Sequence, residues 1–280
     1  MKIGEALSGA AFNTATKPDA STDTQIRILV LGDVIKPQGA KYVASKLREI
    51  RKAENADVAI VNAENTGRHN EFDPECAELL LSSGADILTG GNHSLRSKNI
   101  QKFFEEHKYA IRPLNYPPLC PGNGYVTARL KTGLKLLVIN VAGQVFMDPA
   151  DSPFYATERV LKSVDHDICV VDFHGEATSE KAAFARYFDG RVHVTFGTHT
   201  HVPTADEQIL PLGSGFITDV GMCGVENSII GMNSETVIDR YIRKTNNYAE
   251  LPDETPSIMG AVFTFSMKHK RVIDVKRIKY

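Results

Sequence analysis

The sequence predicts an α/β fold, because short apolar runs alternate with amphipathic helical segments along the first third of the chain. The runs at 25–31, 58–62 and 87–89 are rich in branched apolar residues, as is typical of buried strands. Segments 39–55 and 74–83 lie between them and repeat their apolar residues at helical spacing. This β-α-β-α-β order indicates a parallel sheet.

The rest of the chain continues this mixture, with strands that helices separate less regularly. Part of the sheet should therefore be mixed or antiparallel. Residues 1–25 are rich in Ala, Ser, Thr and Asp without periodicity, and we interpret them as a flexible N-terminal extension before a single domain over 26–280. The remaining expected strands are 136–140, 168–173, 193–196, 215–218 and 261–265, and the remaining expected helices are 98–107, 155–164 and 178–188.

The composition excludes several classes of function. The 280 residues carry 32 Lys and Arg against 34 Asp and Glu, so the chain lacks the basic field that long nucleic acids require, although small phosphorylated ligands remain compatible. The four cysteines form no CxxC pair, which argues against disulfides or a zinc knuckle and favours a reducing compartment. No apolar run approaches the roughly 20 residues that cross a bilayer. We expect a cytoplasmic protein with no membrane partner.

Polar residues of metal-ligand type follow the predicted strands, at the point where each strand ends. In α/β sheets, residues just beyond the carboxyl ends of strands share one crevice. Taken singly, each has an ordinary explanation: Asp33 could cap a helix, Glu64 and Asn65 could form a polar loop, and His174 could be structural. The residues are Asp33, Glu64, Asn65, Asn92, His93, His174, His199 and His201.

The pair His199 and His201 is the strongest local signal. In an extended backbone, a spacing of two puts both imidazoles on one side, while Thr198 and Thr200 face away. Asp172 precedes His174 by two residues and could either orient that ligand or cap a neighbouring loop.

Together these residues supply enough ligands for two metal ions. We expect one ion at Asp33, Glu64, Asn65 and His201. A second ion would lie at Glu64, Asn92, His174 and His199, with Glu64 as the bridge. Nitrogen and oxygen ligands without thiolates favour Mn, Fe, Mg or Zn, and among these we favour Fe or Mn, as two divalent or mixed-valence ions. Phosphoester hydrolysis is the reaction that most needs such a pair.

Six segments with these residues stand in an order that resembles the bacterial YmdB-like metallophosphoesterases, a branch of the calcineurin-like superfamily. The resemblance runs from about Arg27 to near the C-terminus. The segments are Gly32–Val34, Asn62–Asn65, Gly91–His93, Asp172–Lys181, Gly197–Val202 and Ile217–Met222.

This resemblance implies a four-layer α/β/β/α sandwich with mixed sheets and a dinuclear metal centre at its strand ends. It also implies a cytoplasmic homo-oligomer that hydrolyses cyclic nucleotides, in the first place 2′,3′-cyclic and in the second 3′,5′-cyclic ones. The implied metal ligands are the seven residues assigned above, and His93 would be the acid that protonates the leaving oxygen. We expect a metal-bridging hydroxide to attack phosphorus in line.

The chain departs from the family pattern in two places. Lys36 stands where the family typically has glycine, and Ser94-Leu95-Arg96 replaces Thr-Trp-Asp in a chain that has no Trp. We expect Lys36 and Arg96 to add positive charge around the mouth of the site, and the missing aromatic to remove a surface for base stacking.

Three other functions are compatible with the same residues. The first is a phosphatase or nuclease of the same fold. The second is a regulatory protein that binds a phosphorylated ligand with low turnover, although a binding protein needs no proton donor such as His93. The third, a metal-dependent amidohydrolase built on the His-x-His pair, is disfavoured by the Gly-Asn-His and Glu-Asn elements.

Overall fold

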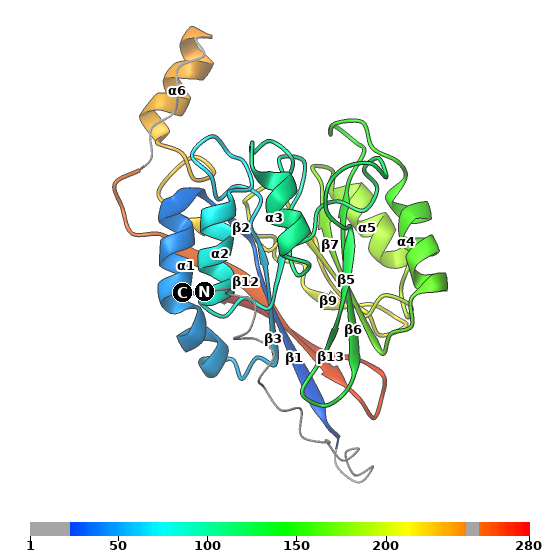
Figure 1. Cartoon of the computed structure of the whole chain (residues 1–280). Coiled ribbons are helices and arrows are strands. Elements are labelled where there is room, and N and C mark those ends of the chain that lie inside the picture. Colours follow the sequence, from blue (N-terminus) through cyan, green and yellow to red (C-terminus); the bar gives the residue numbers. More distant parts are fainter. Residues whose placement is uncertain (1–22, 245–251) are drawn as a thin grey trace, which may run out of the picture.

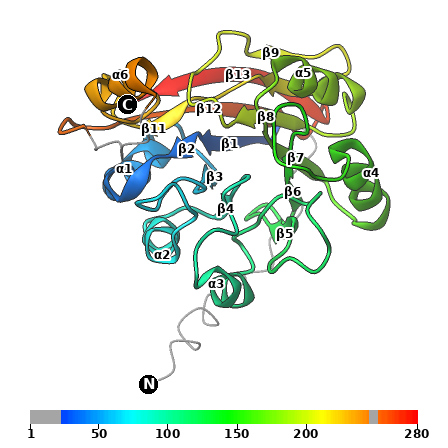
Figure 2. The same ribbon diagram turned by 90° about the horizontal axis from the view of Figure 1, so that it is seen from above.

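The structure is a computed structural model that describes residues 23–244 and 252–280. Figures 1 and 2 show two β-sheets with helices on their outer sides, which confirms the predicted α/β/β/α sandwich. Residues 1–22 of the predicted extension 1–25 lie outside the described residues. The helices are α1 (Lys36–Ala53), α2 (Pro74–Ser82), α3 (Ile100–Glu106), α4 (Pro153–Ser163), α5 (Thr178–Tyr187) and α6 (Ser234–Arg243).

One sheet has seven strands and is mixed, as predicted. Its strands are β1 (Gln25–Leu31), β2 (Asp33–Val34), β3 (Val58–Asn62), β4 (Ile87–Thr89), β11 (Met222–Gly224), β12 (Ser257–Ser266) and β13 (Arg271–Lys279). The order is β2-β11-β12-β1-β3-β4, with β13 also paired to β12. Strands β1, β3 and β4 run parallel, whereas β12 is antiparallel to β1 and to β13.

The second sheet has six strands. They are β5 (Tyr125–Arg129), β6 (Lys135–Ala142), β7 (Ile168–His174), β8 (Val194–Thr198), β9 (Gln208–Ile209) and β10 (Gly215–Ile217). The order is β5-β6-β7-β8-β10-β9; the four inner strands are parallel and the two edge strands antiparallel.

Alternation along the strands separates three apolar layers. In β1, Ile26, Ile28 and Val30 pack between the two sheets, while Leu29 and Leu31 pack under the helices of the first sheet. Strands β6 and β7 alternate in the same way between the inter-sheet core and the core under α4 and α5. Because both faces of these strands are buried, their sequences read as continuous apolar runs.

The helices begin where local chemistry favours a start. Proline occupies the first turn of α1, α2 and α4, where its missing N–H costs no hydrogen bond. The Asp73 carboxylate caps α2 by accepting from the Cys76 backbone N–H at 2.9 Å. Because Pro37 is compatible with a first helical turn, helix α1 starts at Lys36, three residues before the predicted start at Gly39.

The sequence analysis missed several elements that are less apolar or very short. Strand β13 has mostly exposed or half-buried residues, and edge strand β5 buries only Val126. Helix α6 leaves Ile238, Tyr241 and Ile242 exposed and lies apart from the layered body in Figure 1. The two strands therefore lack the continuous apolar runs of the central strands, whereas α6 is amphipathic but leaves most of its apolar stripe exposed.

The described chain starts close to the sheet. The Asp23 carboxylate accepts from Ser266 Oγ at 2.7 Å and from the Lys268 backbone N–H at 3.2 Å. Gln25 then pairs with Ser266 at the start of β1. Across residues 23–244 and 252–280, no helix has the length and apolar character needed to span a membrane.

His193 should make folding sensitive to acid. Its Nδ1 accepts from the Cys169 backbone N–H at 3.0 Å, and burial lowers its pKa from 6.5 to about 4, with His166 adding to the effect. The unfolded chain thus binds more protons between these values, so His193 does not oppose folding above pH 6.5 and costs stability as the pH falls toward 4.

We expect His193→Asn, whose Oδ1 can still accept from Cys169, to reduce the loss of stability between pH 7 and 4.5. The expected reduction is roughly 1–2 kcal/mol, because solvent screens part of the charge on the half-buried ring. Urea unfolding of the metal-free protein at both pH values measures this, and exposed His269→Asn is the control. An unchanged acid sensitivity in His193→Asn would contradict the assignment.

Candidate metal centre

The carboxyl ends of β1, β3 and β4 from one sheet lie next to those of β7 and β8 from the other. The predicted site residues follow or end these strands, and one network of contacts within 4 Å joins all of them. The structure therefore brings together every residue that the sequence analysis selected: Asp33, Glu64, Asn65, Asn92, His93, His174, His199 and His201.

One half of the network surrounds Asp33. Asn65 Nδ2 lies 3.4 Å from Asp33 Oδ1 and 3.2 Å from His201 Nε2. His201 Nε2 is also 3.8 Å from Asp33 Oδ1, and the His199 backbone N–H donates to Asp33 Oδ2 at 3.0 Å. A 180° rotation of the Asn65 amide would direct its oxygen to the same place. This half corresponds to the first predicted ion site.

The other half surrounds His174. Its Nε2 lies 2.5 Å from Glu64 Oε2, 3.1 Å from Asn92 Oδ1 and 3.1 Å from His199 Nδ1. These four residues are the second predicted ligand set, and Glu64 stands between the two halves.

The nitrogens that face away from the site fix the protons on two of the imidazoles. The Thr198 hydroxyl donates to Asp172 Oδ1 at 2.7 Å, so its oxygen accepts from His174 Nδ1 at 3.0 Å. His199 Nε2 lies 3.2 Å from Glu176 Oε2, an acceptor. Burial lowers the pKa of both rings to about 4, so both are neutral at pH 7. His174 Nε2 and His199 Nδ1 therefore point lone pairs into the site.

His201 follows the same pattern, because its Nδ1 is 3.0 Å from the backbone oxygen of Ile230 and leaves Nε2 facing inward. Glu64 Oε2 is buried and has no hydrogen-bond donor among the described residues, and the lone pair of His174 Nε2 lies 2.5 Å away. Several electron pairs thus converge with no proton between them. This is the donor set of a cation site.

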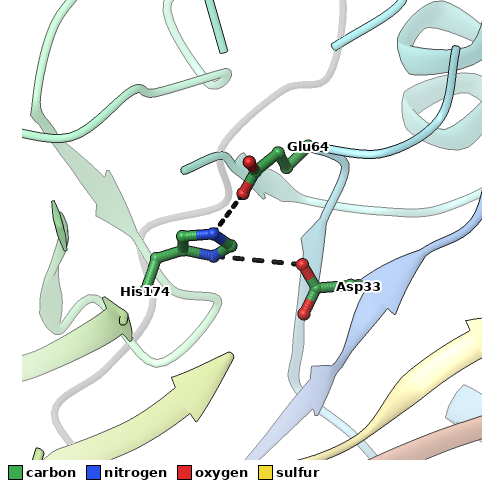
Figure 3. Close-up of side chains that lie close together, drawn as sticks. All are labelled: Asp33, Glu64 and His174. Atoms are coloured by element: carbon green, nitrogen blue, oxygen red, sulfur yellow. Dashed lines mark ion pairs between the residues drawn. The ribbon is translucent and has the colours of Figure 1, made fainter. Parts of the chain in front are cut away.

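Electrostatics lead to the same conclusion. Asp33 and Glu64 are fully buried, and burial raises the pKa of both carboxyl groups above their ordinary values. Buried carboxylates without a full complement of donors are costly unless a positive charge compensates them. Figure 3 shows Asp33, Glu64 and His174 directed toward one another, and one ligand atom from each lies within 4.8 Å of the others.

Gly91 makes room for this arrangement. A Cβ atom at position 91 would lie 1.8 Å from Glu64 Oε2 and 2.4 Å from His174 Nε2. No other residue fits there without displacing two of the candidate ligands. The glycine of the Gly-Asn-His motif is therefore required by the packing of the site itself.

His93 differs from the other histidines of the site. Its backbone N–H donates to Glu64 Oε1 at 2.8 Å, and its Nδ1 lies 3.0 Å from Asn65 Oδ1. Its side chain is 19% exposed, between His201 at 13% and His199 at 24%, whereas that of His174 is fully buried. Burial lowers the pKa of His93 to about 4, and the charge of Glu64 opposes this effect. The His93 ring is thus held by two candidate ligands, Glu64 and Asn65.

The expected geometry of the His-x-His pair is wrong in one respect. Strand β8 ends at Thr198, and His199 and His201 have φ values of 101° and 64°, so the segment is not extended. Thr198 does not face away but contacts His174. Such backbone strain in non-glycine residues persists only where surrounding contacts impose it, and it is concentrated at functional sites.

A buried ion pair that the sequence analysis did not assign imposes this strained turn. Lys181 Nζ donates to the Thr198 backbone oxygen at 2.8 Å and to Asp219 Oδ2 at 2.9 Å. The same Asp219 oxygen accepts from the Thr200 backbone N–H at 3.1 Å. A lysine in the amphipathic pattern of α5 gives no signal that distinguishes it from a solvent-exposed one.

Lys36 does not add charge at the mouth of the site, contrary to expectation. It is 1% exposed, and its Nζ donates to the Arg68 backbone oxygen at 2.7 Å. Its φ of 62° explains why a glycine suits this position, and its backbone N–H donates to the backbone oxygen of Asn65 at 2.7 Å. Leu95 packs against the apolar core between the seven-stranded sheet and its helices. Arg96 is exposed, and its charge helps to lower the pKa of His93.

Comparison with known proteins confirms the resemblance. A family model described as YmdB-like protein matches residues 29–278. The chain is 35% identical over 255 residues to the 2′,3′-cyclic-nucleotide 2′-phosphodiesterase of Bacillus subtilis (strain 168), covering 90% of this chain and 96% of that protein.

Two solved structures are similar over nearly their whole length. A hypothetical protein from Thermus thermophilus has a TM-score of 0.85 at 36% identity, with coverage of 91% of this chain and 99% of that one. A novel phosphatase from Mycoplasma pneumoniae has a TM-score of 0.84 at 33% identity, with coverage of 92% and 94%.

Proposed function

Because the chain belongs to the YmdB-like protein family, we propose that it is a metal-dependent phosphodiesterase that hydrolyses cyclic nucleotides. Its preferred substrates would be 2′,3′-cyclic nucleotides, with 3′,5′-cyclic nucleotides second. The observation that carries this proposal is the convergence of unprotonated imidazole nitrogens and buried carboxylates at one edge of the sandwich, with His93 beside them. A relative named as a 2′,3′-cyclic-nucleotide phosphodiesterase supports the substrate class.

The donor set fits two cations. Asp33, Asn65 and His201 would hold one, and Asn92, His174 and His199 the other, with Glu64 between them. Nitrogen and oxygen donors without thiolates favour Mn, Fe, Mg or Zn, and among these we propose Fe or Mn. When bound, two such ions neutralise phosphoryl oxygens and lower the pKa of the attacking water.

The residues of the chain supply the rest of the chemistry. His93 is fixed by Glu64 and Asn65, so its ring can deliver a proton to the departing ribose oxygen without reorientation. In the metal-free protein the ring has a pKa of about 4 and is neutral at pH 7, so the acid role requires that His93 take up a proton before the leaving oxygen departs.

A substrate comparison under one metal condition tests the proposal. We expect turnover of 2′,3′-cyclic AMP to exceed that of 3′,5′-cyclic AMP and of a phosphomonoester when the protein is loaded with Mn²⁺. The structural relative named as a phosphatase makes monoester hydrolysis the second candidate, and faster monoester turnover would favour it. Tight nucleotide binding without turnover across Mn, Fe, Mg and Zn would contradict both and indicate a binding protein. A cytoplasmic homo-oligomer remains our prediction for its state in the cell.

A further inference from the structure

The carboxylate of Asp172, in the middle of the molecule, connects the two sheets directly behind the candidate centre. Oδ1 accepts from Thr198 Oγ1 at 2.7 Å, and Oδ2 accepts from Thr89 Oγ1 at 2.5 Å and from Asn62 Nδ2 at 3.0 Å. Asp172 and Thr198 belong to the six-stranded sheet, whereas Asn62 and Thr89 end strands β3 and β4 of the seven-stranded sheet. All four side chains are fully buried.

The hydrogens in this cluster leave one arrangement for Thr198. Burial raises the pKa of Asp172 to about 7, while the hydrogen bonds from Thr89, Thr198 and Asn62 favour the ionised form. The Thr198 hydroxyl has a single proton, and above this pH the carboxylate can only accept, so that proton points to Asp172. The Thr198 oxygen then faces His174 Nδ1, at 3.0 Å, with lone pairs alone. His174 must therefore carry its proton on Nδ1, and Nε2 presents a lone pair toward Glu64, Asn92 and His199.

We propose that Asp172 and Thr198 are positioning residues of the metal centre, which fix the Nδ1-protonated tautomer of His174 so that Nε2 is free to bind an ion. The inference rests on the metal centre of the proposed function. It resolves the two roles considered for Asp172: the residue acts on His174, through the Thr198 hydroxyl, and does not cap a loop.

The same cluster also fixes the distance between ligands from different sheets. The Asn62 side chain donates to Asp172 and accepts from the Glu64 backbone N–H at 3.0 Å. Glu64 follows β3 and His174 ends β7, so the Asp172 cluster holds these two ligands at a constant separation. A centre whose ligands come from two sheets needs such a connection, because each sheet could otherwise shift independently.

Three substitutions separate this role from simple packing. Thr198→Val keeps the shape of the side chain but removes the hydroxyl, and Thr198→Ser restores it. Asp172→Asn introduces an N–H that can donate to the Thr198 oxygen, which frees the Thr198 proton to point at His174 Nδ1 and reverses the tautomer. The matched control is Thr218→Val, which removes another buried threonine hydroxyl that donates to an aspartate, Asp206, and touches no histidine of the site.

The first readout is the ¹⁵N NMR spectrum of histidine-labelled, metal-free protein, which reports tautomers without any bound ion. We expect several rings with protonated Nδ1, because the Nδ1 atoms of His107, His166 and His201 also face backbone oxygens. The signal that disappears in His174→Gln identifies the His174 ring, which should carry its proton on Nδ1 in the wild type and in Thr198→Ser. In Asp172→Asn that ring should carry its proton on Nε2, and in Thr198→Val it should be a mixture. Thr218→Val should match the wild type. An unchanged tautomer in both Asp172→Asn and Thr198→Val would overturn the proposal.

The second readout is calorimetric titration with Mn²⁺. Loss of a hydrogen bond behind a metal ligand weakens binding about 10–100-fold, and we expect this loss for Thr198→Val and Asp172→Asn. Thr198→Ser and Thr218→Val should bind close to the wild-type affinity. Equal affinity in all variants would overturn the positioning role alone, whereas a wild type that binds no Mn²⁺ would overturn the metal centre together with it.

Discussion

Replacing Glu64 with glutamine is expected to remove at least one of two bound divalent ions and to reduce phosphodiester hydrolysis roughly 10²–10³-fold, since each ion contributes several kcal/mol of charge stabilisation. Glu64 is the predicted bridge, and its Oε2 is a buried oxygen to which none of the described residues donates. The amide oxygen of glutamine can still accept from the His93 backbone N–H, but its nitrogen would face His174 Nε2. Metal analysis of the dialysed variant measures the loss.

The same substitution should have the opposite effect on the metal-free protein. Burial raises the pKa of Glu64, so its ionised form costs stability at pH 8, and the new amide can donate to the lone pair of His174. We expect metal-free Glu64→Gln to be more stable than metal-free wild type by about 1–3 kcal/mol.

Glu54→Gln is the matched control for this prediction. Glu54 is also buried but is paired with Lys276 and Tyr280 at the far side of the sheet, so its variant should lose stability and keep its metal. A Glu64→Gln protein that retains two ions, or that is less stable than wild type without them, would contradict the bridging role.

His93→Ala is expected to separate proton donation from metal binding. The variant should bind the normal complement of ions while its turnover of 2′,3′-cyclic AMP falls about 10²–10⁴-fold, the usual contribution of a general acid. The loss should be much smaller for a diester with a nitrophenyl leaving group, because that oxygen departs without protonation. Steady-state kinetics with both substrates measure the difference.

Metal loss in His93→Ala in proportion to its activity would make His93 a ligand and contradict its role as acid. Equal losses on the two substrates would do the same, since a missing acid penalises the poor leaving group more. The structure supports the acid role through position: the His93 ring contacts candidate ligands through its Nδ1 edge, whereas the other three rings turn one nitrogen into the centre.

Much of the fold could be predicted because both faces of its central strands are buried. The runs that became β1, β3, β6 and β7 consist of apolar residues on both faces, and the helices between them carry a clear apolar stripe. Strand β13 could not be predicted in this way, because most of its residues are exposed or half-buried and form no continuous apolar run. Helix α6 was missed although its sequence is amphipathic.

The candidate site could be selected from sequence because its members share a place, just beyond the carboxyl ends of parallel strands. Of the residues behind the site, Asp172 could be suggested from its place two residues before His174. Its partner Thr198 and the Lys181–Asp219 pair could not, because nothing in the sequence relates these residues before the strands are paired. The left-handed backbone of His199 and His201 was likewise unpredictable, since tertiary contacts impose it against local preference.

The location of bound metal tests the account most directly. A crystal of the protein loaded with Mn²⁺ should show two anomalous peaks, one on each side of Glu64. Asp33, Asn65 and His201 should surround the first, and Asn92, His174 and His199 the second, with His93 bound to neither. A single peak, a peak away from this edge of the sandwich, or a manganese ion coordinated by His93 would contradict it.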